Sequence, residues 1–393
     1  MQEIPIVLIG HKDHGKSTLI GRLLLDTKSV RESRLKEVKE VDESIGQKFE
    51  LAHLVDSFKE ERENEMTMDT TRAILKGKER NYQLIDVPGH KELIASMLTG
   101  AAGAEAALLL VSIEEGIREQ TRQHLEIAKL LGIDQLGVVV NKMDKVGYQK
   151  EEFDQITERM KEILDKIGYS SENIHFFPIS AWEGDNVVER SRKMPWYKEK
   201  TVLEFIEGEI KEPESFQNLP LIFLVQDKYL DECKEILVGP VESGRLKVNQ
   251  KILILPDRRE GEIKTIRDIT GESVEAETGQ NIGIEICQGK KMLTNISRGN
   301  VITTLNSNIK TSRDISGEIF WITAPSGSNL VFECGTASVE GQLVEPKVVN
   351  QGEKTYYRIL LRKEIAVFPR SRTILGKIVI KDKGKIIAVG SIQ

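Results

Sequence analysis

Cysteines and long apolar runs are scarce in this 393-residue sequence. The three cysteines, Cys233, Cys287 and Cys334, are widely spaced and odd in number, and no CxxC motif accompanies them. Such spacing argues against a disulfide framework or a structural zinc site and indicates isolated thiols. The longest apolar stretch, around Ala104 to Ile113, is interrupted by Glu105 and is shorter than the ~18 residues that cross a bilayer. We therefore expect no membrane span.

The N-terminus has no basic segment before its first apolar run, Ile4 to Ile9, and no small-residue cleavage site. These are the features of a secretory signal peptide, so the run predicts a first β-strand instead. A cytoplasmic location is the corresponding expectation.

The sequence is also poor in net positive charge. A formal net charge of -6 argues against a chain that coats nucleic acid along its whole surface. The residues from Thr311 to Gln393, however, include 12 lysines and arginines against 8 aspartates and glutamates. This C-terminal region could hold an RNA backbone locally, although a charged surface without a partner explains the same balance equally well.

The sequence pattern differs between two regions of the chain. From Ile4 to about Lys211, β-branched runs alternate with helix-period stretches, which predicts an α/β domain with a mostly parallel sheet flanked by helices. After Pro213, short apolar runs are broken by glycine, asparagine and proline, which predicts two β-barrel domains. The expected domains are 1–212, 213–308 and 309–393. The strands expected in the first domain are Ile4 to Ile9, Tyr82 to Asp86, Ala106 to Ser112, Leu136 to Asn141 and Ile174 to Ile179.

The segment after the first strand reads GHKDHGKS and fits the pattern G-x-x-x-x-G-K-[ST] of a phosphate-binding P-loop. Glycines let backbone N–H groups converge on phosphate oxygens, and the helix that follows adds its positive dipole end. Lys16 would supply charge to the phosphates, and Ser17 would bind magnesium. The residues predicted to contact the nucleotide here are Gly10, His11, Asp13, His14, Gly15, Lys16, Ser17 and Thr18.

Asp86 to Gly89 form a D-x-x-G motif at the end of the next expected strand. A carboxylate at that position would help to hold magnesium, so Asp86 is a candidate metal residue. Gly89 is where a backbone N–H can approach a γ-phosphate. Thr67, which precedes this strand in a polar segment, is a weaker candidate for a third magnesium residue.

Asn141, Lys142 and Asp144 belong to an N-K-x-D motif at the end of a further expected strand. A carboxylate at Asp144 accepts hydrogen bonds from the N1–H and the exocyclic amine of guanine, which adenine cannot donate. Ser180 and Ala181 end another apolar strand and would complete base recognition through the backbone. The four motifs, in this order, predict a P-loop protein that binds GTP and GDP with Mg2+.

On the basis of these motifs, the sequence resembles the family of elongation factor Tu and elongation factor 1-alpha over essentially its whole length. GHKDHGKS is similar to the family's GHVDHGKS, and DVPGH, which ends at His90, matches its D-x-P-G-H. Thr67 lies in ERENEMTMD, which is similar to the first switch, E-R-x-x-G-I-T-I-D. GQNIG, which contains Asn281, resembles G-D-N-I-G of the second domain.

This resemblance implies a GTPase that converts GTP to GDP and phosphate, with His90 as the catalytic residue that positions the attacking water. It also implies that Thr67 is the switch threonine and that Asn281 lies beside the aminoacyl end of a bound tRNA. The implied partners are the ribosome, aminoacyl-tRNA and a nucleotide exchange factor, and the expected state is a monomer.

The sequence also departs from the family. Two apolar residues that guard the catalytic histidine are replaced by Lys12 and Met66, and the switch glycine is replaced by Glu65. Gly335 stands where the 1-alpha branch usually has histidine in C-H-T-A. These changes predict a divergent paralogue. They affect the expected identity of the substrate more than the expected GTPase activity.

Two alternatives remain open at this point. One is the GTPase subunit of sulfate adenylyltransferase, which Ile319-Phe320-Trp321 resembles, although that family usually has D-D-G-K-S where this chain has Asp13-His14 before GKS. The other is a ribosome-rescue GTPase that binds a protein partner and no tRNA. The leading interpretation is a translation elongation switch that delivers aminoacyl-tRNA or a tRNA-like partner.

Overall fold

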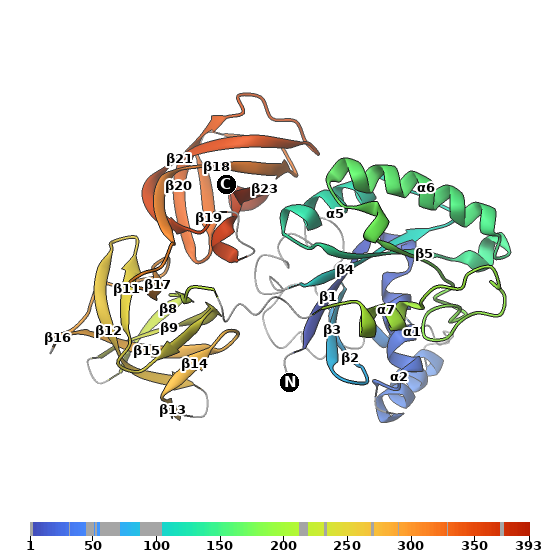
Figure 1. Ribbon diagram of the computed structural model, residues 1–393, viewed down its shortest axis with the longest axis horizontal. Coiled ribbons are helices and arrows are strands. Elements are labelled where there is room, and N and C mark those ends of the chain that lie inside the picture. The colour runs from blue at the N-terminus through green and yellow to red at the C-terminus, as the bar shows by residue number, and fades with distance from the viewer. Residues whose placement is uncertain are drawn as a thin grey trace. The chain divides into compact units, whose positions relative to one another are not determined.

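The computed structural model describes residues 3–30, 32–44, 51, 53–55, 71–86, 104–211, 219–231, 234–268, 271–289, 291–327, 329–369 and 373–393 (Figure 1). The chain divides into two compact units, Met1–Glu212 and Pro213–Gln393. Within the described ranges, no helix is both long and apolar enough to cross a membrane.

The first unit is built on a six-stranded sheet with the strand order β2-β3-β1-β4-β5-β6. All neighbouring strands are parallel except β2 and β3, which are antiparallel. The sheet confirms the predicted α/β class. The strands are β1 Ile4–Gly10, β2 Thr71–Lys76, β3 Asn81–Asp86, β4 Ala106–Ser112, β5 Gln135–Asn141 and β6 His175–Pro178.

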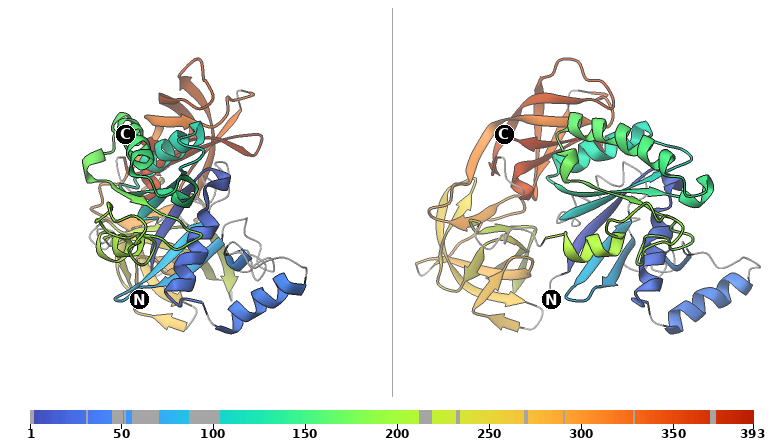
Figure 2. Two further views of the ribbon diagram at one scale, coloured as in Figure 1. Left: turned by 90° about the vertical axis from the view of Figure 1, so that its right-hand side faces the viewer. Right: turned by 45° about the vertical axis from the view of Figure 1, so that its right-hand side comes forward.

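Helices cover both faces of this sheet, with α1 and α7 on one face and α5 and α6 on the other (Figures 1 and 2). The apolar spacing of α6 explains its position, because Phe153, Ile156, Met160 and Leu164 recur at helical intervals and are all buried. The α-helices are α1 Lys16–Asp26, α2 Glu32–Ser44, α5 Glu119–Leu130, α6 Lys150–Ile167 and α7 Val202–Gly208; three short 3-10 helices are η1 Lys12–His14, η2 Met143–Val146 and η3 Ser171–Asn173.

The second unit begins with a closed ring of six strands in the order β12-β11-β17-β7-β9-β15, which the pairing of β12 with β15 completes. The ring closes around a core that includes Phe223, Ile252 and Ile284. Its strands are β7 Ile222–Leu224, β9 Lys234–Ser243, β11 Lys251–Leu255, β12 Arg259–Asp268, β15 Asn281–Gln288 and β17 Val301–Thr304. Shorter strands flank it: β8 Asp227–Asp231, β10 Arg245–Lys247, β13 Gly271–Ser273, β14 Glu275–Glu277 and β16 Lys291–Met292.

A second closed barrel follows, with the strand order β18-β21-β20-β19-β22-β23. Trp321, Phe332 and Tyr357 fill its interior together with Cys334, whose thiol pKa is raised to about 12 by burial. Two barrels after an α/β unit are the predicted fold class. The strands are β18 Lys310–Trp321, β19 Leu330–Cys334, β20 Ala337–Glu345, β21 Lys354–Val367, β22 Lys377–Asp382 and β23 Lys385–Ile392, and η5 Ile374–Gly376 precedes β22.

The glycine at 335 has a local structural reason. It forms the turn between β19 and β20 with a φ of 58°, in the left-handed region where glycine is favoured. A Cβ at this position would lie 3.2 Å from Leu375 Cδ2. The departure from C-H-T-A thus coincides with a tight turn over the barrel core.

Candidate functional site

The loop between β1 and α1 contains two positions that tolerate only glycine. Gly10 has a φ of 142°, and a Cβ there would lie 2.5 Å from the Leu110 carbonyl oxygen. Gly15 has a φ of 92°, and its Cβ would lie 2.4 Å from Asn141 Nδ2. Both glycines let the loop press against the sheet. The first turn of α1 then presents N–H groups that have no partner within the helix, which is the arrangement that binds phosphate oxygens.

Lys16 is held inside this loop. Its side chain is buried, with 5% of its surface exposed, and its ammonium donates to the carbonyl oxygens of Gly10 at 3.1 Å and His11 at 3.0 Å. Burial lowers the pKa of Lys16, against the opposing effects of Asp86 and Asp13. The loop therefore positions one cation beside the helix N-terminus before any phosphate arrives.

Ser17 and Asp86 meet at the carboxyl ends of the sheet. The Ser17 hydroxyl donates to Asp86 Oδ2 at 2.7 Å, and Asp86 is buried at the end of β3. A hydroxyl and a carboxylate are oxygen ligands of the kind that Mg2+ prefers, so this pair fits the predicted metal. Among the other predicted loop residues, His14 is buried, His11 and Thr18 are half-buried, and Asp13 is exposed.

Asn141 joins the phosphate loop to the base-binding segments. Its Nδ2 donates to the His14 carbonyl oxygen at 2.9 Å. Its Oδ1 accepts from the backbone N–H groups of Lys142 at 2.8 Å and Ala181 at 2.9 Å. Lys142 has a φ of 68°, which turns the chain directly after β5. One side chain thus connects three of the motifs that sequence analysis predicted separately.

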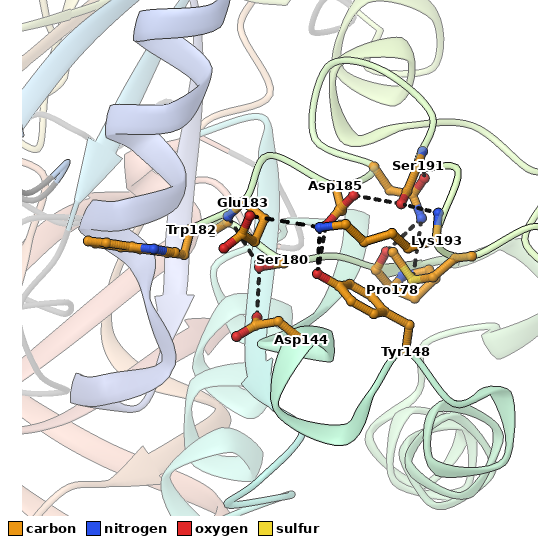
Figure 3. A network of polar contacts seen from close by, with 12 residues as sticks. Asp144, Tyr148, Pro178, Ser180, Trp182, Glu183, Asp185, Ser191 and Lys193 are labelled. Atoms are coloured by element: carbon orange, nitrogen blue, oxygen red, sulfur yellow. Dashed lines mark hydrogen bonds and ion pairs between the residues drawn. The ribbon is translucent and has the colours of Figure 1, made fainter.

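Asp144 lies beside Ser180, as base recognition requires. Asp144 Oδ1 accepts from the Ser180 hydroxyl at 2.7 Å (Figure 3). Asp144 Oδ2 is 3.9 Å from Lys145 Nζ. The carboxylate therefore retains lone pairs that can accept hydrogen bonds from a ligand. Trp182, which follows this segment, is 54% exposed and points away from the polar network (Figure 3).

Arg22 of α1 is a positioning residue that the sequence patterns did not reveal. Its Nε donates to the Ala181 carbonyl oxygen at 3.1 Å, and its guanidinium also donates to the Trp182 carbonyl oxygen. Asp26, one turn later on α1, lies 3.5 Å from the same guanidinium. The helix that begins at the phosphate loop therefore also holds the Ala181–Trp182 segment, which is predicted to face the base.

A network around Asp185 braces the Ser180 loop from its other side (Figure 3). Asp185 accepts from the Tyr148 hydroxyl at 2.9 Å, the Lys193 ammonium at 3.1 Å and the Ser191 hydroxyl at 2.6 Å. Burial opposes ionisation of Asp185, but these donors outweigh it and lower its pKa. None of these four residues belongs to a nucleotide-binding motif, so only their contacts identify their role.

Three predicted residues lie outside the described ranges. These are Thr67, Gly89 and the catalytic candidate His90. Glu65 and Met66, where the sequence differs from the family pattern, also lie outside these ranges. Their assignments stay predictions. Lys12, the remaining departure, is exposed on η1.

Comparison with known proteins shows the family of the chain. The model of the elongation factor Tu GTP binding domain matches residues 2–229. Elongation factor 1-alpha of Hyperthermus butylicus is 35% identical over 98% of this chain and 95% of its own length. The corresponding proteins of Thermococcus sibiricus (35% identical, 99% and 97%) and Methanoculleus marisnigri (32% identical, 98% and 95%) are similar over comparable spans. The chain therefore belongs to the elongation factor Tu and elongation factor 1-alpha family of GTPases, which bind guanine nucleotides and hydrolyse GTP.

Proposed function

We propose that this translation elongation GTPase delivers an aminoacyl-tRNA, or a tRNA-like partner, to the ribosome in its GTP-bound form. The observation that carries this proposal is the span of the similarity. Relatives named elongation factor 1-alpha match 98% to 99% of the chain, so the likeness extends past the GTPase unit through both barrels. A GTPase that shared only the nucleotide site would match the first unit alone.

In the proposed nucleotide complex, the phosphate loop and Lys16 bind the phosphates while Asp144, Ser180 and Ala181 bind the guanine. Ser17 and Asp86 would hold Mg2+, and we propose Thr67 as the third metal residue. A bound Mg2+ neutralises charge on the β- and γ-phosphates. Catalysis then depends on positioning and charge stabilisation, and no covalent intermediate is needed.

We propose that His90 positions the attacking water. Phosphoryl transfer depends strongly on the orientation of the nucleophile, so the His90→Ala variant is expected to hydrolyse GTP at least severalfold more slowly when stimulated by ribosomes. Single-turnover phosphate release measures this rate, and GTP affinity, which is expected to be unchanged, serves as the control. An unchanged stimulated rate would remove His90 from the mechanism.

The second barrel presents basic side chains that a nucleic-acid backbone could engage. β21 has three exposed basic residues at intervals of four positions, Lys354, Arg358 and Arg362. Each lies within ion-pair distance of a carboxylate, at 3.0, 2.6 and 2.6 Å respectively. Exposed pairs of this kind contribute little to stability, so phosphates can replace the carboxylates at little cost. The carboxylate partners are Glu318, Asp314 and Glu340.

Asn281 is the first residue of β15 and is exposed. Because Asn281 belongs to the GQNIG motif, we propose that this residue of the first barrel lies beside the aminoacyl end of a bound tRNA. We also propose three domains, 1–212, 213–308 and 309–393, in a cytoplasmic monomer that is served by a nucleotide exchange factor. Sedimentation of the purified chain with GDP tests the monomer directly.

Protection of the aminoacyl ester tests the proposed function. Mixed aminoacyl-tRNA is incubated with the purified protein and either a non-hydrolysable GTP analogue or GDP, and the rate of deacylation is measured. We expect slower deacylation with the GTP analogue only, because a carrier must release its cargo after hydrolysis. Equal deacylation in both states, with nucleotide binding verified in the same samples, would contradict the proposal. That result would favour the sulfate-activating or the ribosome-rescue alternative.

A further inference from the structure

Two histidines and a glutamate converge beside the phosphate loop. His11 Nδ1 lies 3.7 Å and His14 Nε2 lies 3.6 Å from the same oxygen, Glu115 Oε2. All three atoms lie within 4.8 Å of one another. His11 and His14 belong to the loop after β1, whereas Glu115 belongs to the segment after β4. The three groups are thus brought together by the parallel pairing of two neighbouring strands.

The hydrogen bonding of His14 fixes which of its nitrogens carries the proton. His14 Nδ1 lies 3.0 Å from the Leu110 carbonyl oxygen, which can only accept, so Nδ1 donates. The ring is fully buried, and burial favours its neutral form by lowering the pKa of His14. His14 Nε2 therefore carries a lone pair and faces Glu115 Oε2, which is also an acceptor.

These acceptors lack a donor of their own. Among the described residues, neither His14 Nε2 nor His11 Nδ1 has a hydrogen-bond partner. The nearest cation to Glu115 is Arg118, whose Nη2 is 3.8 Å from Oε2, and that side chain is half exposed. Lys16 is committed to the carbonyl oxygens of Gly10 and His11. A buried imidazole acceptor that faces a carboxylate oxygen, with a second unpartnered imidazole nitrogen beside it, is an arrangement that a Lewis acid can occupy.

We propose that His11 Nδ1, His14 Nε2 and Glu115 Oε2 bind a divalent transition-metal ion of the Zn2+ or Co2+ class, with a fourth position open to water or an anion. Tetrahedral zinc with bonds of about 2.0–2.1 Å places its ligands about 3.3 Å apart. The two separations from Glu115 Oε2, 3.6 and 3.7 Å, need to close by a few tenths of an ångström, and the ligand atoms of the two histidines, which lie within 4.8 Å of each other, need to approach by up to about 1.5 Å.

The surroundings of His14 match those of metal-binding histidines. Such histidines usually donate their second ring N–H to a carbonyl or carboxylate, as His14 Nδ1 does to Leu110. Imidazole nitrogen suits zinc and cobalt, whereas Mg2+ prefers oxygen ligands. This site is therefore chemically distinct from the Ser17 and Asp86 pair.

A bound ion would also act on the phosphate loop. The His11 carbonyl oxygen accepts from Lys16 Nζ at 3.0 Å. An ion that fixes the His11 ring against Glu115 would fix that carbonyl as well. The metal site would thus tie the conformation of the loop to the segment that follows β4.

Cobalt spectroscopy on the untagged full-length protein, saturated with GDP and Mg2+, tests this site. We expect one equivalent of Co2+ to produce the visible absorption of a four-coordinate ion, and Zn2+ but not excess Mg2+ to displace it. The Glu115→Gln variant should bind Co2+ at least about tenfold more weakly, since even outer-shell changes cost about 10- to 100-fold. The matched control is Glu119→Gln, four residues later and exposed, which should retain wild-type affinity.

Each contrary result would overturn the site. These results are no visible band at saturating Co2+, displacement of Co2+ by Mg2+, or equal affinities in the two glutamate variants. Glu115 is 27% exposed and lies outside the proposed nucleotide contacts, so GDP binding by the variant reports that it has folded. A failure of aminoacyl-tRNA binding would leave this measurement unaffected, because the experiment contains only GDP and metal ions.

Discussion

Replacing Asp144 by asparagine is expected to shift the nucleotide preference from guanosine to xanthosine nucleotides. The carboxylate can accept two hydrogen bonds from guanine, whereas the amide offers one acceptor and one donor. The donor would face the exocyclic amine of guanine but would pair with the carbonyl oxygen that xanthine has there. Hydrogen bonds to a charged group contribute about 1.5–3 kcal/mol each, so GDP affinity should fall roughly hundredfold or more.

The structure indicates that this variant keeps its fold. Asp144 Oδ1 accepts from the Ser180 hydroxyl at 2.7 Å, and an asparagine carbonyl can accept the same bond. Competition between fluorescent GDP and unlabelled GDP or XDP measures the change. Asp154→Asn makes the same chemical change on α6, where the half-exposed carboxylate lies 3.7 Å from Lys150, and should leave the preference unchanged. Retained guanine selectivity in the Asp144 variant would show that Asp144 does not read the base.

Replacing Lys16 by methionine is expected to abolish tight binding of both GTP and GDP. Methionine is apolar and is similar in length to lysine, so it can fill the buried space without the charge. The ammonium that donates to Gly10 and His11 would be lost, and with it the cation that faces the phosphates. Removing one partner of a buried charged contact costs about 2–5 kcal/mol, which corresponds to a loss of roughly thirty- to several thousandfold in affinity.

Equilibrium titration with fluorescent GDP measures this loss, and the base preference should remain unchanged because Asp144 is intact. Lys150→Met on α6 is the matched control, since Lys150 is exposed and lies 3.7 Å from Asp154 on the surface of the helix. Wild-type affinity in the Lys16 variant would show that the ammonium stays with its loop carbonyls and does not contact phosphate.

The fold class and most first-unit strands could be predicted because their signals are local. Buried strands such as Ala106–Ser112 read as continuous apolar runs, and the motifs follow directly at their ends. The edge strand Thr71–Lys76 escaped prediction because its apolar run, Ala73 to Leu75, is only three residues long. It pairs with β3 in antiparallel register, which no local pattern specifies.

Long-range contacts explain what sequence analysis missed in the site. Arg22 and Ala181 are separated by 159 residues, and nothing near either of them marks the hydrogen bond that joins them. Asp185, Tyr148 and Lys193 likewise come from different segments. Closure of both barrels depends on pairing between strands that are distant in sequence, such as β18 with β23. The sequence predicts the components of the site, and the tertiary structure determines how they are connected.

Asn141 has a consequence for the rate at which a nucleotide leaves. Because its side chain contacts His14 in the phosphate loop and Ala181 in the base loop, a displacement of the base loop that moves Asn141 with it removes a hydrogen bond from the phosphate loop. A protein that pushes on the base loop alone would therefore loosen the grip on the phosphates, although it never touches them. Such a protein would accelerate the exchange of GDP for GTP from one end of the nucleotide, without access to the predicted magnesium side.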